Sequence, residues 1–244
     1  MNRGREAVEV LRPQGRGHVL LTSEHAGEAL PEGVDWPAQD EWLRGTHWAV
    51  DLGAAALTRE LSAAMDAPAI LARYSRLWAD ANRPRGSDTL FRELAEGRPV
   101  ALNQSLSPAE RTRRLEHCYA PYHAAVRETL AASAARVVFA IHSFTPVYEG
   151  ERRSLALGVL FDREEELACE VARALEALGQ PVALNEPYSG RLGLIYSASL
   201  HAEAHGRRAL ELEVRQDLCV DASFRAELTE VLVRALDAWD AREI

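Results

Sequence analysis

Residues 137–143 read VVFAIHS, an apolar run that ends on a histidine and a serine. A short apolar run without polar alternation is typical of a buried strand in a sheet that is covered on both faces. We therefore expect a strand from Val137 to Ile141. His142 and Ser143 should then follow the strand, at the edge of the sheet where it ends.

Further apolar runs lie on both sides of this one. We expect strands over residues 18–22, 69–73, 155–161, 182–184 and 209–214, and helices over residues 45–65, 107–133, 162–179 and 221–239. Strands that alternate with helices predict right-handed βαβ units. The expected fold is α/β, a three-layer α/β/α arrangement with a mixed, mostly parallel sheet. Because the sequence contains no repeat or linker-like tract, we expect a single domain over residues 1–244.

Composition narrows the classes of function. Hydrophobic residues make up 47% of the 244 residues, which fits a globular protein, and the net charge of −9 argues against nucleic-acid binding. The three cysteines are far apart, so we expect reduced thiols rather than disulfides. The chain has no apolar signal segment and no run long enough to cross a membrane. We expect a cytoplasmic protein without membrane partners; self-association into a homo-oligomer stays open.

Polar side chains suited to catalysis occur at the ends of three predicted strands. His25 follows the run HVLLT, His142 follows VVFAI, and Glu213 lies in ALELEV. In open α/β sheets, ligands bind at the carboxyl ends of the strands, so these residues can converge. Imidazole and carboxylate groups are typical zinc ligands, and three of them leave one position for water. The pattern predicts a metal site with His25 and His142 as ligands.

Two residues compete for the third ligand position. Asp51 lies in the first turns of the helix expected from Gly45 and could face the crevice. Glu24 is adjacent to His25, but neighbours along a strand point to opposite faces unless the chain bends. We favour Asp51 and keep Glu24 as the alternative ligand.

Glu213 is the candidate general base. A carboxylate among apolar neighbours is costly unless it is paired or used in catalysis. It could remove a proton from the attacking water and pass it to the leaving amine. An ion pair with Arg215 is the alternative interpretation. Glu211 shares the face of Glu213, and the pattern does not decide which of them faces the crevice.

Arginine side chains near the second predicted strand suggest how a substrate is held. Arg76, Asn82 and Arg83 lie in a probable loop, and a guanidinium group binds a carboxylate through two parallel hydrogen bonds. A solvated loop is the alternative. Arg215 and His205 are added as substrate-binding candidates. His205 belongs to the segment HAEAH, for which a polar loop or helix face is the competing interpretation.

Six segments taken together resemble the N-formylglutamate amidohydrolase family: TSEHAG, WAVDLGA, SRLWADANRP, AIHSFTP, NEPYSG and LELEVRQDL. They follow the family's order from about residue 18 to about residue 220. The resemblance implies a fold similar to zinc carboxypeptidases, of the phosphorylase/hydrolase-like type, and hydrolysis of N-formyl-L-glutamate. It also implies a Zn²⁺ cofactor, with other divalent metals as alternatives. The roles implied are those of metal ligands for His25, Asp51 and His142, carboxylate binding for Asn82 and Arg83, and general base for Glu213.

Two other functions remain open from the sequence. A carboxypeptidase-like peptidase that acts on small or cell-wall peptides could use the same residues. A metal-free binding protein for acidic metabolites would keep the arginine loop without catalysis. The chain also departs from many family members at Glu24, where they have proline, so fold and metal chemistry should transfer better than the substrate.

Overall fold

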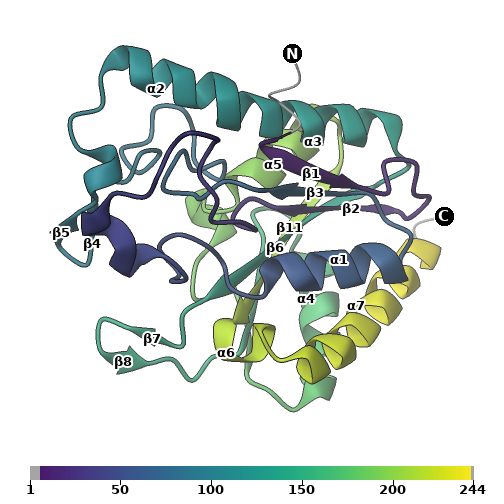
Figure 1. Cartoon of the computed structure of the whole chain (residues 1–244). Helices are drawn as coiled ribbons and strands as arrows, with labels where there is room; N and C mark the ends of the chain where they lie inside the picture. Colours follow the sequence, from purple (N-terminus) through teal and green to yellow (C-terminus); the bar gives the residue numbers. More distant parts are fainter. Residues whose placement is uncertain (1–5, 243–244) are drawn as a thin grey trace.

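One seven-stranded sheet organises the computed structural model, which describes residues 6–242 (Figure 1). The four central strands are parallel to one another, whereas β1 and the β9–β10 pair run in the opposite direction. The prediction of a mixed, mostly parallel sheet is therefore confirmed. In spatial order the strands are β1 (Val8–Leu11), β3 (Ala69–Ala72), β2 (Val19–Ser23), β6 (Val137–Phe144), β11 (Arg208–Arg215), β9 (Leu157–Leu160) and β10 (Val182–Leu184).

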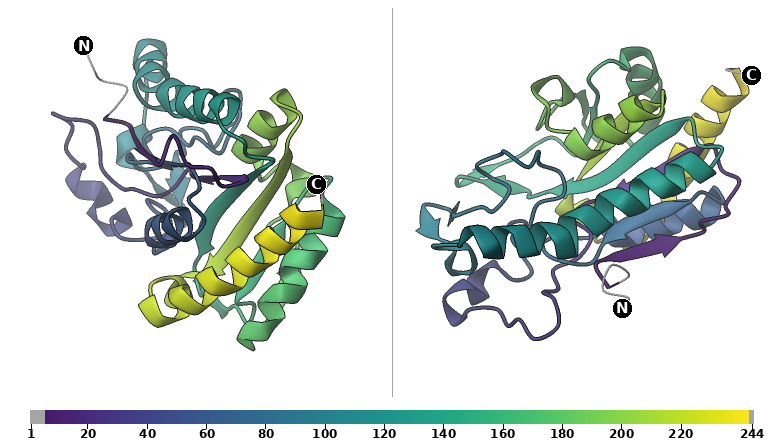
Figure 2. Two further views of the ribbon diagram at one scale, coloured as in Figure 1. Left: turned by 90° about the vertical axis from the view of Figure 1, so that its right-hand side faces the viewer. Right: turned by 90° about the horizontal axis from the view of Figure 1, so that it is seen from above.

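Helices cover both faces of the sheet, which confirms the three-layer prediction (Figure 2). One face is covered by α1 (Ala54–Ala64), α4 (Glu165–Leu175) and α7 (Ala222–Arg242). The other face is covered by α3 (Ala120–Ala132) and α5 (Tyr196–Ala204). The remaining helical segments are α2 (Pro108–Arg114), the π-helical turn Leu115–Tyr119, α6 (Gln216–Cys219) and the 3-10 turns Ala38–Leu43, Ala101–Asn103, Glu176–Leu178 and Gly190–Leu192.

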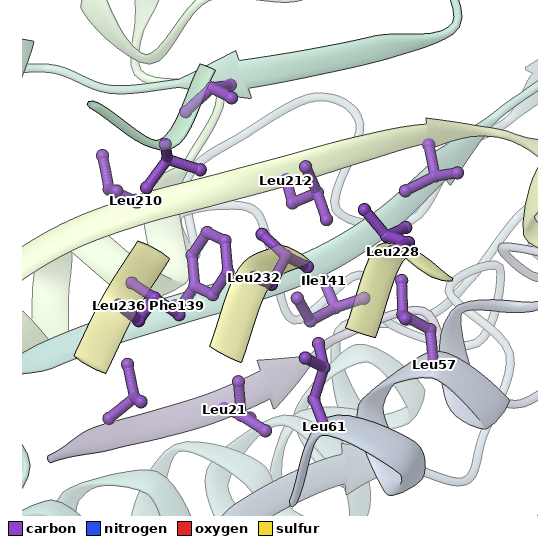
Figure 3. Close-up of a cluster of buried hydrophobic side chains, with 14 of the residues drawn as sticks. Leu21, Leu57, Leu61, Phe139, Ile141, Leu210, Leu212, Leu228, Leu232 and Leu236 are labelled. Carbon is purple, nitrogen blue, oxygen red and sulfur yellow. The ribbon is translucent and has the colours of Figure 1, made fainter. Parts of the chain in front are cut away.

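A leucine-rich core joins the sheet to α1 and α7. Figure 3 shows Leu57 and Leu61 of α1 facing side chains of the central strands, among them Leu21 and Ile141. All four side chains are fully buried. Because burying a leucine or isoleucine side chain contributes about 1.5–3 kcal/mol, this layer holds the central strands at fixed positions.

Strand alternation decides which side chains reach the opposite layer. In β6, Phe139 and Ile141 pack toward α1 and α7, whereas Val138 and Ala140 pack toward α3 and α5. The same two-residue period places His142 on the α3/α5 side. Glu213 of β11 lies directly opposite His142 in the parallel register, so its side chain is on that side as well.

Several expected boundaries were wrong. The first helix begins at Ala54 rather than Gly45, because Gly53 has φ 85° and interrupts the helical path that the apolar spacing suggested. A side chain at Gly53 would also meet the Cys219 carbonyl oxygen at 2.3 Å. Strand β6 continues through His142 to Phe144, because β11 pairs with it along that length.

Two hairpins project from the end of the sheet where the central parallel strands finish (Figure 1). The first pairs β4 (Leu94–Ala95) with β5 (Arg98–Pro99), and the second pairs β7 (Val147–Tyr148) with β8 (Glu151–Arg152). The sequence did not predict either hairpin, nor strand β1. Within residues 6–242, no helix is both long and apolar enough to cross a membrane.

Candidate metal centre

The carboxyl ends of the central strands bring three distant ligand candidates together. His25 follows β2 by two residues, and His142 lies near the end of the neighbouring strand β6. Asp51 lies in the turn before α1, and its backbone N–H donates to the His25 carbonyl oxygen at 2.9 Å. This backbone hydrogen bond ties the turn to the end of β2, which explains how a residue outside the sheet reaches the site.

The three side chains offer ligand atoms that lie close to one another. One atom from each of His25, Asp51 and His142 lies within 4.8 Å of the other two. Nδ1 of His142 is 2.9 Å from Oδ2 of Asp51, and Nδ1 of His25 is 3.4 Å from the same oxygen. The His25 Nδ1 atom is buried and has no hydrogen-bond partner among the described residues. Such an unpartnered buried nitrogen is costly unless it coordinates something.

Carboxylates on the far side of each imidazole fix its orientation. Nε2 of His25 is 2.8 Å from Asp80 Oδ1, and Nε2 of His142 is 2.9 Å from Glu24 Oε2. Glu24 also accepts a hydrogen bond from the Tyr122 hydroxyl at 2.7 Å. Carboxylate partners of this kind orient metal-binding histidines and raise their basicity. Glu24 therefore contacts Nε2 of His142, whereas Nδ1 of the same ring faces Asp51.

A cavity of about 280 Å³ opens above this cluster. Its wall includes the guanidinium groups of Arg76, Arg83 and Arg92. Arg76 is already paired with Asp80 at 3.0 Å, whereas Arg83 and Arg92 have no carboxylate partner within residues 6–242. Burial lowers the pKa of Arg92, and the nearby charge of Arg76 adds to this effect. An anionic ligand would relieve this crowding of positive charge.

Two glutamates of β11 complete the wall, and both face the cavity. Burial raises the pKa of Glu211 to about 7 and also raises the pKa of Glu213. Glu211 is 3.5 Å from the Asn82 side-chain nitrogen, while Glu213 has a buried Oε2 without a hydrogen-bond partner in the described chain. Glu213 thus keeps one oxygen free of hydrogen bonds within the described chain.

The sequence matches a known family. The protein-family model FGase, which is described as N-formylglutamate amidohydrolase, matches residues 17–220 of the chain. The chain belongs to the N-formylglutamate amidohydrolase family.

Relatives of this family member cover nearly its whole length. It is 26% identical to the N-formylglutamate deformylase of Pseudomonas aeruginosa, over 93% of this chain and 95% of the relative. The crystal structure of gene product Atu2144 from Agrobacterium tumefaciens superimposes with a TM-score of 0.86 at 32% identity, covering 98% and 96% of the two chains. The N-formylglutamate amidohydrolase from Ralstonia eutropha has the same fold, with a TM-score of 0.75 at 22% identity over 98% and 99%.

The structure separates the predicted substrate-binding residues of this family member into two groups. Arg76, Asn82 and Arg83 line the cavity. Arg215 and His205 do not line it in the part of the chain that the structure describes, so the structure does not bring these two residues to the cavity. Arg215 is the last residue of β11, and its guanidinium pairs with Asp217 at 2.7 Å. His205 lies just beyond α5, outside the wall of the cavity.

Sequence reasoning missed several residues that line the cavity. Arg92, Trp48, Tyr148 and Tyr188 all face it, from loops and hairpins rather than from strand ends. Asp80, in the segment SRLWADANRP, also contacts His25, a role that the sequence did not predict. The sequence around His25 does not indicate this partner, because the two residues are 55 positions apart in the chain.

Proposed function

We propose that the chain is a metal-dependent amidohydrolase that cleaves the amide bond of an N-acyl amino acid, with N-formyl-L-glutamate as the leading substrate. The observation that carries the proposal is the cluster of His25, Asp51 and His142 at the base of a cavity that also holds guanidinium groups without carboxylate partners. Membership in the N-formylglutamate amidohydrolase family supports the same substrate class.

Zinc suits the proposed ligand set. Two imidazoles and one carboxylate are common zinc ligands in catalytic sites, which leave a position for water or substrate. The buried, unpartnered Nδ1 of His25 supports a cation at this point. A divalent cation held there would lower the pKa of a water molecule and polarise the substrate carbonyl.

Glu213 is the proposed general base. It takes a proton from the attacking water as the new C–O bond forms at the acyl carbon, and it returns a proton to the nitrogen as the C–N bond breaks. For N-formyl-L-glutamate and one water molecule, the products are formate and glutamate. The unpartnered Oε2 of Glu213 supports this role, because no neighbour in the described chain competes for that oxygen.

Substrate carboxylates are proposed to bind Arg83 and Arg92. Both guanidinium groups line the cavity, and neither forms an ion pair with a carboxylate of the described chain. Asn82 supports the loop that carries Arg83, because its side chain donates to the Leu194 carbonyl oxygen at 3.1 Å and accepts from the Ser197 backbone N–H at 3.0 Å. We place the activity in the cytoplasm, which three cysteines without disulfides favour.

Formate release from N-formyl-L-glutamate tests the proposal. We expect the wild-type protein to turn it over and Glu213→Gln to lower kcat by at least ~10²-fold, the usual contribution of a general base, with unchanged metal content. Glu227→Gln on the exposed side of α7 serves as the matched control and should keep full activity. If Glu213→Gln retains wild-type kcat, Glu213 is not the base. Ligand binding that is insensitive to a chelator, without hydrolysis, would instead favour a metal-free binding protein.

A further inference from the structure

A second cavity of about 640 Å³ adjoins the cavity above the metal-binding cluster. We name them the outer and the inner cavity. His47, Trp48, Arg92 and Tyr148 line both, so the two spaces share a boundary. Small-molecule sites commonly measure ~300–1,000 Å³, and the inner cavity of about 280 Å³ alone suits a compound as small as a formylated amino acid. The outer cavity is therefore space that the leading substrate does not need.

The two hairpins form the walls of the outer cavity. Each hairpin turns through a Glu-Gly pair with positive φ at both residues, which is the geometry of a type I′ turn. In one hairpin the pair is Glu96 and Gly97, and in the other it is Glu149 and Gly150; all four residues line the outer cavity. The hairpins thus face each other across this space.

Apolar side chains gather on these hairpins although they are open to solvent. Leu94, Val147 and Tyr148 are 57%, 43% and 40% exposed, and each of them lines the outer cavity. Trp48 adds an indole ring at the boundary. A cluster of exposed apolar side chains beside a reactive site is typical of a surface that a ligand covers.

The distribution of charge indicates which part of a ligand would lie in the outer cavity. Arg92, at the boundary, stacks over the Trp48 ring at 5.4 Å and has no carboxylate partner within residues 6–242. Beyond it, the charged groups lining the outer cavity are the carboxylates of Glu96 and Glu149. A substrate carboxylate is therefore favoured at Arg92 and disfavoured further out, where an uncharged apolar group fits.

We propose that the outer cavity binds an aromatic or branched aliphatic group of a substrate larger than N-formyl-L-glutamate. This group is attached at the end of the N-acyl amino acid that lies furthest from His25, Asp51 and His142. The inference rests on the proposed amidohydrolase function and narrows its substrate class to N-acyl amino acids that carry an apolar extension.

The experiment compares matched substrates on the wild-type protein. The compounds are N-formyl-L-glutamate and its conjugates in which phenylalanine or glycine is joined by an amide to either carboxyl group. Phenylalanine and glycine conjugates have the same backbone, so their ratio of kcat/KM isolates the side chain. We expect the better-used phenylalanine conjugate to exceed its glycine counterpart at least ~10-fold, as burial of a benzyl group allows.

Substitutions in the two hairpins test whether their apolar side chains cause the preference for the phenylalanine conjugate. We expect Leu94→Asp and Val147→Asp to reduce the phenylalanine-to-glycine ratio to about one through loss of apolar contact, while both retain turnover of the glycine conjugate. That turnover also reports that each variant is folded. Leu200→Asp, at a comparably exposed leucine on α5 that lies outside both cavities, should keep the wild-type ratio.

The possible results distinguish failure of the outer-cavity proposal from failure of the proposed amidohydrolase function. A wild-type ratio near one, a preserved ratio in both hairpin variants, or turnover confined to N-formyl-L-glutamate would overturn the outer-cavity proposal and leave the amidohydrolase function intact. Absence of turnover with every compound by the metal-loaded protein would overturn the proposed function and, with it, this inference.

Discussion

Replacing Asp80 with asparagine perturbs the metal centre without touching a proposed ligand. Asp80 Oδ1 lies 2.8 Å from Nε2 of His25 and also accepts the Asn82 backbone N–H at 2.9 Å, while Oδ2 pairs with Arg76 at 3.0 Å. Asparagine preserves the shape of the side chain but removes its negative charge. His25 then loses the carboxylate partner that orients its ring.

The expected magnitude follows from this geometry. Loss of a carboxylate that orients a metal-binding histidine typically weakens metal affinity ~10–100-fold, which corresponds to about 1.4–2.7 kcal/mol. Arg76 would then keep Asp51, whose Oδ1 is 3.6 Å from its guanidinium, and this positive charge beside a proposed ligand would push the loss toward the upper end of the range. Turnover at saturating metal should fall less than affinity, because the ligand atoms themselves are retained.

The assay is competition for zinc between the protein and a chelator of known affinity. Asp40→Asn is the matched control: Asp40 is also buried, but among the described residues its side chain accepts hydrogen bonds only from the backbone N–H groups of Ala101 and Leu102. We expect that variant to be less stable in urea yet to bind zinc with wild-type affinity. Asp80→Asn with affinity within about twofold of wild type would refute the orienting role, since at least ~10-fold is expected.

Three further outcomes follow from the site and its surroundings. Arg83→Lys should raise KM with little change in kcat, because lysine lacks the planar fork that binds a carboxylate; an unchanged KM removes Arg83 from substrate binding. Chelator should lower Tm, because a ligand bound only by the native state stabilises it; an unshifted Tm argues against a bound cation. Burial lowers the pKa of His123 and His201 to about 4, so the folded state binds fewer protons than the unfolded state between about pH 4 and about pH 6.5. Their contribution to the free energy of unfolding is complete above that window and falls as pH drops. Relative to His123→Phe/His201→Leu, urea titrations should show wild type losing about 4 kcal/mol from about pH 7 to about pH 5, about 2 kcal/mol for each histidine, whereas parallel curves would contradict this.

Much of the fold was visible in the sequence because buried parallel strands produce uninterrupted apolar runs. The runs at residues 137–141 and 209–214 lie in β6 and β11, which form adjacent strands of the sheet. Strand β1 was missed because only Val8 of its four residues is buried, so its pattern is weak. The two hairpins are only two residues per strand, too short for any periodicity to be recognised.

The site was predictable only where chemistry coincides with a strand end. His25 and His142 meet this condition, and their strands are neighbours. Asp51 was placed in a helix, yet it reaches the cluster from a turn that a backbone hydrogen bond holds against β2. Asp80 and Arg92 come from long loops whose course depends on tertiary packing. No local pattern could assign them partners.

The most direct test of the account is the metal content of the purified protein, measured by mass spectrometry together with that of His142→Ala. The proposed cluster predicts stoichiometric divalent metal in the wild-type protein and loss of both metal and hydrolysis in the variant, because one of three ligands is gone. Wild-type protein that hydrolyses N-formyl-L-glutamate without bound metal would contradict the account. So would a His142→Ala variant that keeps its metal and its activity.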